Sequence, residues 1–389
     1  MRTIIRRIAL TRALTLCAGI VVAAANQAGA QQNGAERPYT TWRSYGGGPH
    51  SSQYSALDQI NESNVSKLEV VWEFPVGERS FVFNPIVVDD TMYVLARDNE
   101  IVALDAATGA EKWAHPHEGG VNGRGINYWQ SRDGSDRRLV YLNAGFVTAL
   151  NARTGETITS FGDNGRVDLR TALAASGWDI TNVRPLGNSN PGRIYDNLMI
   201  VTLPAQGAGY SSTPGNVQAY DVVTGKHVWT FHAIPHPGEL GYDSWPKDAY
   251  KTAGGVHNWS EFTVDEANGI AFIPFGTARY DFYGGNRAGD NLYANSLVAL
   301  DARTGKRLWH QQLVHHDLWD YDLPQAPKLL TIRDGQRQRQ VVAQATKHGF
   351  LFVFDRKTGE AVWPIEERRV PQSDVPGEHT SPTQPFPTK

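Results

Sequence analysis

The sequence predicts an all-β chain folded as a β-propeller, and a repeated short motif is the main reason. Five segments carry Asp or Asn followed by Thr at the third and Gly at the fourth position, and four of them end in Trp at the eighth. The segments are 102–113, 148–159, 218–229, 298–309 and 352–363. Repeats of about 40–50 residues with several strands and a Gly/Trp signature are typical of propellers, whose blades bury their faces only against neighbouring blades.

Each copy of the motif is expected to form a β-hairpin. In the first copy an apolar strand leads to Asp105, whose side chain can accept hydrogen bonds from the turn backbone, and Gly109 can adopt a positive φ. The tryptophans of the motif are expected to pack between blades and not to bind a ligand. They are Trp113, Trp229, Trp309 and Trp363. The loops between copies differ in length, and function is expected in those loops.

Residues 1–30 are typical of a secretory signal peptide. Four arginines precede an apolar run that ends in Ala28-Gly29-Ala30, so we expect cleavage before Gln31. The alternative is a membrane anchor, but the apolar run 13–25 is short for a span of about 20 residues. The expected organisation is therefore a signal peptide over 1–30 and a propeller domain over 31–389.

The composition narrows the possible partners and cofactors. The chain has 37 basic and 40 acidic residues, and loss of the arginine-rich segment 1–30 makes it more acidic, so nucleic acid is not an expected partner. Cys17, the only cysteine, lies in the same segment, which leaves no disulfide, thiolate metal ligand or Cys-x-x-Cys-His haem attachment in 31–389. No Gly-x-Gly-x-x-Gly follows an expected strand, which disfavours a nicotinamide enzyme.

The repeat and the opening segment 41–74 together resemble the tryptophan-docking propeller of the dehydrogenases that use pyrroloquinoline quinone (PQQ). The likeness runs from about Trp42 to Lys389. Five further segments resemble the branch of membrane glucose dehydrogenases and polyol or quinate dehydrogenases: 167–170, 236–250, 280–287, 314–324 and 375–389. The family's propeller has eight blades, so the five motif copies imply about five to six blades here and a chain truncated at its C-terminus.

The resemblance implies a periplasmic enzyme, either free or membrane-associated, that oxidises a sugar, a polyol or a related hydroxyl compound. Hydride would pass to PQQ with an Asp as general base, and electrons would go on to ubiquinone or cytochrome c. Ca²⁺ or Mg²⁺ is implied beside the cofactor. Residues 275–278 (Phe-Gly-Thr-Ala) stand where relatives have Gly-Thr-Gly-Asn, so one metal ligand is missing and the metal ligands stay unknown. The alternative function is a non-catalytic scaffold propeller, such as an outer-membrane assembly factor.

The candidate catalytic residues are Asp320 and Lys347. Oxidation of an alcohol by a quinone needs a base for the hydroxyl proton beside an electrophilic carbonyl. By resemblance, the Asp after Trp in LVHHDLWDYDLPQAP (313–327) is that base, which selects Asp320; taken alone, the aspartates of this segment could equally form a solvated turn. Lys347 resembles the basic residue that hydrogen-bonds the quinone oxygens, and its alternative is a surface charge.

Two further residues are candidates for holding the cofactor, together with Lys347. PQQ carries three carboxylates, which calls for a guanidinium able to make paired hydrogen bonds. The segment VNGRGINYW (121–129) resembles the one whose Arg does this in the family, which selects Arg124; the alternative is an exposed loop arginine. Trp259 resembles the tryptophan beneath the cofactor ring, although it could equally be a core residue.

The histidines offer a zinc site as another interpretation. His232 and His236 have a spacing found in zinc ligands, but Pro235 and Pro237 prevent the helix that would put both on one face. We therefore interpret them as loop histidines, and His316 as a residue that could border the substrate.

Overall fold

The computed structural model describes residues 39–77, 82–97, 99–187, 190–207, 210 and 212–389. The expected signal peptide over 1–30, with Cys17, lies outside these residues. Within them, no helix has both the length and the apolar character needed to cross a bilayer.

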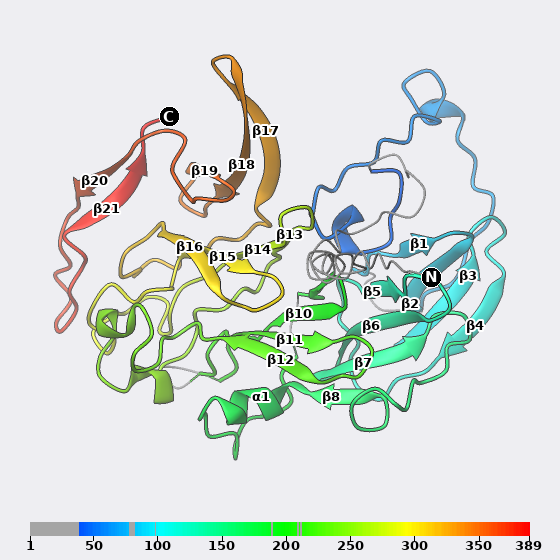
Figure 1. Cartoon of the computed structure of the whole chain (residues 1–389), viewed down its shortest axis with the longest axis horizontal. Helices are drawn as coiled ribbons and strands as arrows, with labels where there is room; N and C mark the ends of the chain where they lie inside the picture. The colour runs from blue at the N-terminus through cyan, green and yellow to red at the C-terminus, as the bar shows by residue number, and fades with distance from the viewer. Residues whose placement is uncertain (1–38, 78–81, 98, 188–189, 208–209, 211) are drawn as a thin grey trace, which may run out of the picture.

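Antiparallel sheets follow one another in chain order around an arc, as expected for propeller blades (Figure 1). The first sheet contains β1 (Ile86–Val88), β2 (Thr91–Ala96), β3 (Glu100–Asp105) and β4 (Glu111–His115), and the second contains β5 (Asn127–Gln130), β6 (Arg137–Asn143), β7 (Phe146–Asn151) and β8 (Arg166–Asp168). The third contains β9 (Arg193–Tyr195), β10 (Leu198–Thr202), β11 (Val217–Asp221) and β12 (His227–Phe231), and the fourth β13 (Thr263–Asp265), β14 (Ile270–Pro274), β15 (Ser296–Asp301) and β16 (Arg307–Gln312).

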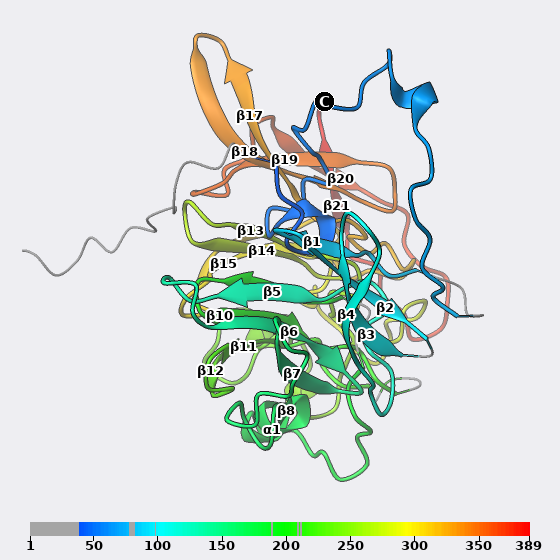
Figure 2. The same ribbon diagram turned by 90° about the vertical axis from the view of Figure 1, so that its right-hand side faces the viewer.

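Two smaller sheets complete the described part of the chain. The fifth has β17 (Lys328–Asp334), β18 (Arg337–Ala345) and β19 (Leu351–Asp355), and the sixth has β20 (Ile365–Arg369) and β21 (Thr383–Pro387). The β17–β18 hairpin projects from the body in both views (Figures 1 and 2). The helices are η1 (Tyr45–Gly47), η2 (Val65–Lys67), α1 (Leu169–Ala175), η3 (Tyr242–Ser244) and η4 (Ala249–Lys251). The prediction of an all-β propeller with five to six blades is confirmed.

Local hydrogen bonds explain why the repeat motif forms hairpins. Asp105 Oδ1 accepts bonds from Thr108 N and Thr108 Oγ1, both at 2.9 Å, and Gly109, at φ 71°, donates its N–H to Asp105 O at 2.8 Å. Equivalent bonds close the turns after Asp221, Asp301 and Asp355. The hairpin prediction is confirmed for the first, third and fourth copies, which form β3–β4, β11–β12 and β15–β16.

The second and fifth copies depart from the predicted hairpin. After each turn the chain returns through a single bridge, Leu150 to Thr157 and Phe354 to Ala361, and then leaves the sheet. In the second copy, β8 pairs with β7 only after a loop. In the fifth, Pro364 has no N–H to continue the ladder, and β20 pairs with β21 instead.

Three of the four motif tryptophans pack beneath the glycine of the following blade. A Cβ atom on Gly155 would lie 2.5 Å from the Trp113 ring, and a Cβ atom on Gly305 would lie 2.4 Å from the Trp229 ring. Trp309 fits under Gly359 in the same way, and its Nε1 donates to Arg356 O at 3.0 Å. The inter-blade prediction is thus confirmed for Trp113, Trp229 and Trp309. Trp72, outside the motif copies, docks likewise under Gly109.

Trp363 differs from the other motif tryptophans. Its side chain is 37% exposed, and the ammonium of Lys389 lies 5.9 Å from its ring centroid. No glycine of a following blade covers it among the described residues.

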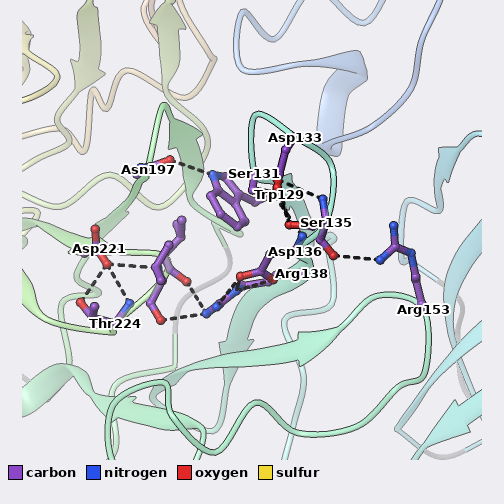
Figure 3. A network of polar contacts seen from close by, with 12 residues as sticks. Trp129, Ser131, Asp133, Ser135, Asp136, Arg138, Arg153, Asn197, Asp221 and Thr224 are labelled. Atoms are coloured by element: carbon purple, nitrogen blue, oxygen red, sulfur yellow. Dashed lines mark hydrogen bonds and ion pairs between the residues drawn. The ribbon is translucent and has the colours of Figure 1, made fainter. Parts of the chain in front are cut away.

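Polar bonds add to the apolar packing at the junction between the second and third blades, where the second motif copy lacks its tryptophan. Arg138 of β6 donates to Val222 O at 3.0 Å and to Val223 O at 2.8 Å, and its guanidinium is also paired with Asp136 (Figure 3). Trp129 of β5 reaches across the same junction and donates Nε1 to Asp196 O at 3.1 Å.

Buried apolar side chains fill the space between consecutive sheets. Ile101 of the first sheet lies in one cluster with Leu139 and Tyr141 of the second, and Ile200 of the third lies with Ile273 of the fourth. Each blade therefore depends on its neighbours for burial, and this holds the connecting loops in fixed relative positions.

Replacing Gly305 by Ala is expected to destabilise the fold by roughly 2–5 kcal/mol. Gly305 has φ 69°, which costs Ala about 1–2 kcal/mol, and the overlap with Trp229 adds about 1–3 kcal/mol. Gly335→Ala is the matched control, since Gly335 has φ 62° but nothing within 4 Å of the added Cβ. Thermal unfolding should show a larger fall in Tm for Gly305→Ala; equal falls would mean that the Trp229 contact does not constrain this position.

Candidate active site

Two loops bring the two predicted catalytic residues into contact. Asp320 lies in the connection from β16 to β17, and Lys347 lies in the connection from β18 to β19. Lys347 Nζ is 2.7 Å from Asp320 Oδ2 and 2.9 Å from Asp322 Oδ2. The lysine therefore bridges two carboxylates and is not a free surface charge.

Asp322 is a member of this cluster that the sequence analysis did not single out. Its Oδ2 also accepts the indole N–H of Trp259 at 2.9 Å, and its Oδ1 accepts Thr277 N at 2.7 Å. The side chain of Asp322 is 8% exposed, whereas that of Asp320 is 32% exposed. The only signal of Asp322 in the sequence was its position two residues after Asp320 in the segment 313–327.

The two carboxyl groups have pKa values that are displaced in opposite directions. Burial and the neighbouring charge of Asp322 raise the pKa of Asp320 to about 6, against the opposing effect of Lys347. Burial also acts to raise the pKa of Asp322, but the hydrogen bonds from Lys347 and from Thr277 N outweigh it and lower that pKa. Asp322 therefore stays ionised, and Asp320 exchanges a proton near neutral pH.

Asp317 fixes the backbone of the loop that carries Asp320. Its carboxylate, in a residue that is 1% exposed, accepts Trp319 N at 2.9 Å and Tyr321 N at 2.7 Å. It also accepts the Asn295 amide at 2.9 Å and the Thr277 hydroxyl, both from the preceding blade. Asp320, between the two bonded amides, has φ 58°. Asp317 is thus the turn-capping aspartate of this segment, and Asp320 is left with its carboxylate directed to Lys347.

A polar pocket of about 470 Å³ adjoins the cluster and contains Arg124 and Trp259. The lining residues are Tyr45, Gln53, Arg124, Trp259, Ser260, Glu261, Pro324, Gln325, Ala326 and Lys328. Arg124 Nη1 donates to Ser260 O at 2.9 Å. Trp259 connects the two regions, since it lines the pocket, bonds Asp322, and has the Lys347 ammonium 5.9 Å from its ring centroid. All four predicted site residues therefore lie in one continuous region.

Four histidines occupy three different kinds of position relative to this region. His257 lies near Asp322 and is partly buried; its buried Nδ1 has no hydrogen-bond partner among the described residues, and burial lowers its pKa to about 4. His316 is 3% exposed, with Nδ1 bonded to Gly289 O, so it packs beneath the loop. The rings of His232 and His236 stack, and His232 bonds Glu239 at 2.8 Å. Within the described ranges, no three His, Cys, Asp or Glu residues are grouped so as to hold a metal ion.

Comparison with known proteins shows which family this chain matches. Residues 42–389 match the family model described as "PQQ: Glucose/ethanol/alcohol dehydrogenase, beta-propeller domain". The quinoprotein glucose dehydrogenase of Gluconobacter oxydans (strain 621H) is 34% identical over 383 residues, which cover 90% of this chain and 46% of that protein. The quinate/shikimate dehydrogenase (quinone) of Acinetobacter baylyi is 32% identical over 388 residues, covering 88% and 46%.

The solved structure of a quinohemoprotein alcohol dehydrogenase from Pseudomonas putida HK5 is similar to this chain, with a TM-score of 0.69 and 28% identity. The alignment covers 84% of this chain and 48% of that one. The chain thus spans about half the length of the relatives it matches.

Proposed function

Because the chain belongs to the family of PQQ-dependent glucose, ethanol and alcohol dehydrogenase β-propellers, we propose that it forms the cofactor-binding part of a dehydrogenase that oxidises a hydroxyl group of a sugar, a polyol or a related compound. The observation that carries this proposal is the contact of Asp320 with Lys347 beside the pocket of Arg124 and Trp259. A base, a cation that can polarise a carbonyl, and an anion-binding pocket are the groups that such a reaction requires.

The residues of the pocket fit a flat polycarboxylate such as PQQ. The volume of about 470 Å³ falls in the range of roughly 300–1,000 Å³ common for small-molecule sites. The Nε and Nη2 donors of Arg124 have no partner among the described residues, which leaves one edge of the guanidinium available to a carboxylate. The hydroxyl of Ser260 is buried and likewise unpartnered within the described chain. Trp259 supplies an aromatic wall.

Bound PQQ would supply the electrophilic quinone carbonyl that accepts hydride from the substrate carbon. Asp320 would take the proton of the substrate hydroxyl, for which its pKa of about 6 is suited near neutral pH. Lys347 uses two of its three donors on Asp320 and Asp322, which leaves one for a carbonyl oxygen. Asp322 would hold Lys347 and Trp259 in place by bonding both.

A divalent cation at this site would need ligands from the cofactor as well as from the protein. Ca²⁺ takes about 6–8 oxygen ligands and Mg²⁺ about six. Asp320 and Asp322 offer carboxylate oxygens, and one side-chain ligand of the family is missing in the segment 275–278. We propose that Ca²⁺ or Mg²⁺ binds only together with PQQ.

The remaining parts of the proposal concern location and the electron acceptor. We place the protein in the periplasm on the basis of the expected signal peptide. Ubiquinone or cytochrome c would accept the electrons, and a quinone is favoured because the Acinetobacter baylyi relative is a quinate/shikimate dehydrogenase (quinone).

The full-length protein that carries this chain, reconstituted with PQQ and Ca²⁺ or Mg²⁺, is expected to reduce an electron-accepting dye with sugars or polyols. Burial raises the pKa of Asp320, so its carboxyl is ionised above about pH 6 and protonated below. The kcat/KM should therefore fall about tenfold per pH unit below pH 6, because the protonated form cannot accept the hydroxyl proton. Steady-state kinetics between pH 4.5 and 8 measure this fall in kcat/KM, which forms the acid limb of the pH profile.

Lys347→Met provides the matched test of the acid limb. Its ammonium stabilises the ionised form of Asp320, so its removal should move the limb of the residual activity to higher pH. A limb that stays in place in Lys347→Met, or a flat profile from pH 5 to 7, would argue against Asp320 as the base. A folded full-length protein that binds no PQQ would favour a scaffold instead.

A further inference from the structure

The charges around the polar pocket do not cancel, although the pocket contains a carboxylate. Glu261 accepts the Tyr45 hydroxyl at 2.6 Å, and Arg193 Nη2 lies 3.4 Å from its other oxygen. Burial and the bond to Glu261 raise the pKa of Tyr45 to about 12, so the phenol stays a donor. Glu261 thus lines the pocket but is already paired with Tyr45 and Arg193. Arg124 and Lys328 are the lining residues whose positive charge has no carboxylate partner among the described residues.

Lys328 has unused hydrogen-bonding capacity. It is the first residue of β17, and its Nζ donates to Ser51 O at 2.6 Å, the one hydrogen bond of its ammonium within the described chain. An ammonium carries three donors, so two remain. Burial lowers the pKa of Lys328; the charge of Glu261 opposes this effect, and that of Arg193 adds to it. A half-buried ammonium with two unsatisfied donors is stabilised by an anion in the pocket.

The two cations come from different parts of the propeller. Arg124 lies before β5 of the second blade, and Lys328 begins the fifth sheet. The Arg124 guanidinium is held by Ser260 O, and the Lys328 ammonium by Ser51 O, so each side chain is fixed by a main-chain carbonyl. Neither bond neutralises a charge. Two positioned cations in one pocket therefore suit a ligand that carries more than one carboxylate.

We propose that Lys328 is a second anchoring residue for the carboxylates of the cofactor and acts with Arg124 as a two-point clamp. This inference rests on the proposed function, because it takes PQQ as the polycarboxylate. Arg124 can make a paired hydrogen bond to one carboxylate, and Lys328 contributes a point charge to another. Trp259 lines the same pocket and would supply an aromatic surface for the ring. Lys328 acts on binding of the cofactor and takes no part in proton transfer.

The test measures PQQ binding by the full-length protein from quenching of tryptophan fluorescence, without substrate. Lys328→Met is expected to weaken PQQ binding by about tenfold to a hundredfold, the range for loss of one hydrogen bond to a charged group. Lys328→Arg should stay close to the wild type. Lys328→Gln keeps a donor for Ser51 O without the charge and should resemble Lys328→Met. Lys306→Met, at an exposed turn outside the pocket, is the control.

A second ligand distinguishes an effect of the Lys328 charge on binding from an effect of pocket shape. The compound 9,10-phenanthrenequinone is a flat tricyclic ortho-quinone without carboxylates, so its affinity should be the same in the wild type and Lys328→Met. Equal weakening for both quinones would overturn the clamp, since it would indicate a general distortion of the pocket. Unchanged PQQ affinity in Lys328→Met and Lys328→Gln would also overturn it and leave the proposed function standing. Absence of PQQ binding in the wild type would instead remove the proposed function, and the clamp with it.

Discussion

Asp320→Asn is expected to lower kcat of the PQQ-reconstituted, full-length enzyme by about 10²–10⁴-fold, the usual contribution of a general base. The amide has nearly the same shape and can still accept the Lys347 hydrogen bond, which measures 2.7 Å in the wild type. It cannot accept the hydroxyl proton. The measurement is dye reduction at saturating substrate and PQQ, at a pH above the acid limb.

Two controls make the Asp320→Asn result interpretable. PQQ affinity, measured by fluorescence, should change little, because Asp320 does not line the pocket of Arg124. Asp58→Asn, at an exposed position, should leave kcat unchanged. A kcat within about threefold of the wild type in Asp320→Asn, with PQQ bound, would show that another group takes the proton.

Arg193→Met is expected to destabilise the fold by about 3–5 kcal/mol, as when one partner of a buried ionic network is removed. Arg193 is 1% exposed, and burial lowers its pKa to about 10, so it remains charged at neutral pH. Its guanidinium donates to Tyr45 O at 3.0 Å, to Ser51 Oγ at 2.8 Å and to Phe262 O at 3.3 Å. Unfolding in urea, followed by circular dichroism, measures the loss.

The double variant Arg193→Met/Glu261→Gln distinguishes lost packing from an unpaired charge. Glu261 lies 3.4 Å from Arg193, so its neutralisation should recover part of the lost stability. Arg193 also ties residues 45–51 to β9, and limited proteolysis should therefore cut this segment faster in the single variant. A loss of unfolding free energy below about 1 kcal/mol would mean that the hydrogen bonds of Arg193 are worth little more than the bonds that its guanidinium makes to water in the unfolded chain.

The sequence was sufficient for the architecture because the repeat encodes a local structure many times. Asp105 and its counterparts close their own turns, and the glycine that each tryptophan covers is part of the same motif. The second motif copy, which departs from the repeat, could also be identified from its local sequence. Thr159 stands in place of the second tryptophan, and at that junction Arg138, which no motif specifies, adds polar bonds to the apolar packing.

The site could be predicted only in part, because its residues meet through tertiary contacts. Asp320, Lys347, Arg124 and Trp259 were selected by resemblance, and the structure brings them into one region. In the sequence, Asp317 and Asp322 could not be distinguished from ordinary aspartates of a solvated turn. Their difference depends on burial and on donors from distant loops, such as Thr277 and Asn295. Lys328 carried no sequence signal, since a lone lysine at the start of a strand is usually a surface residue.

The two kinds of blade junction will respond differently to temperature. Contacts such as Trp229 under Gly305 depend mainly on apolar burial, which weakens on cooling. The junction between the second and third blades also contains buried apolar side chains, such as Val140 and Val201, but Arg138 adds bonds to main-chain carbonyls that do not rely on that effect. Cold therefore weakens the apolar packing at every junction, and the second and third blades, which include the strand that follows Arg124, keep the Arg138 bonds in addition.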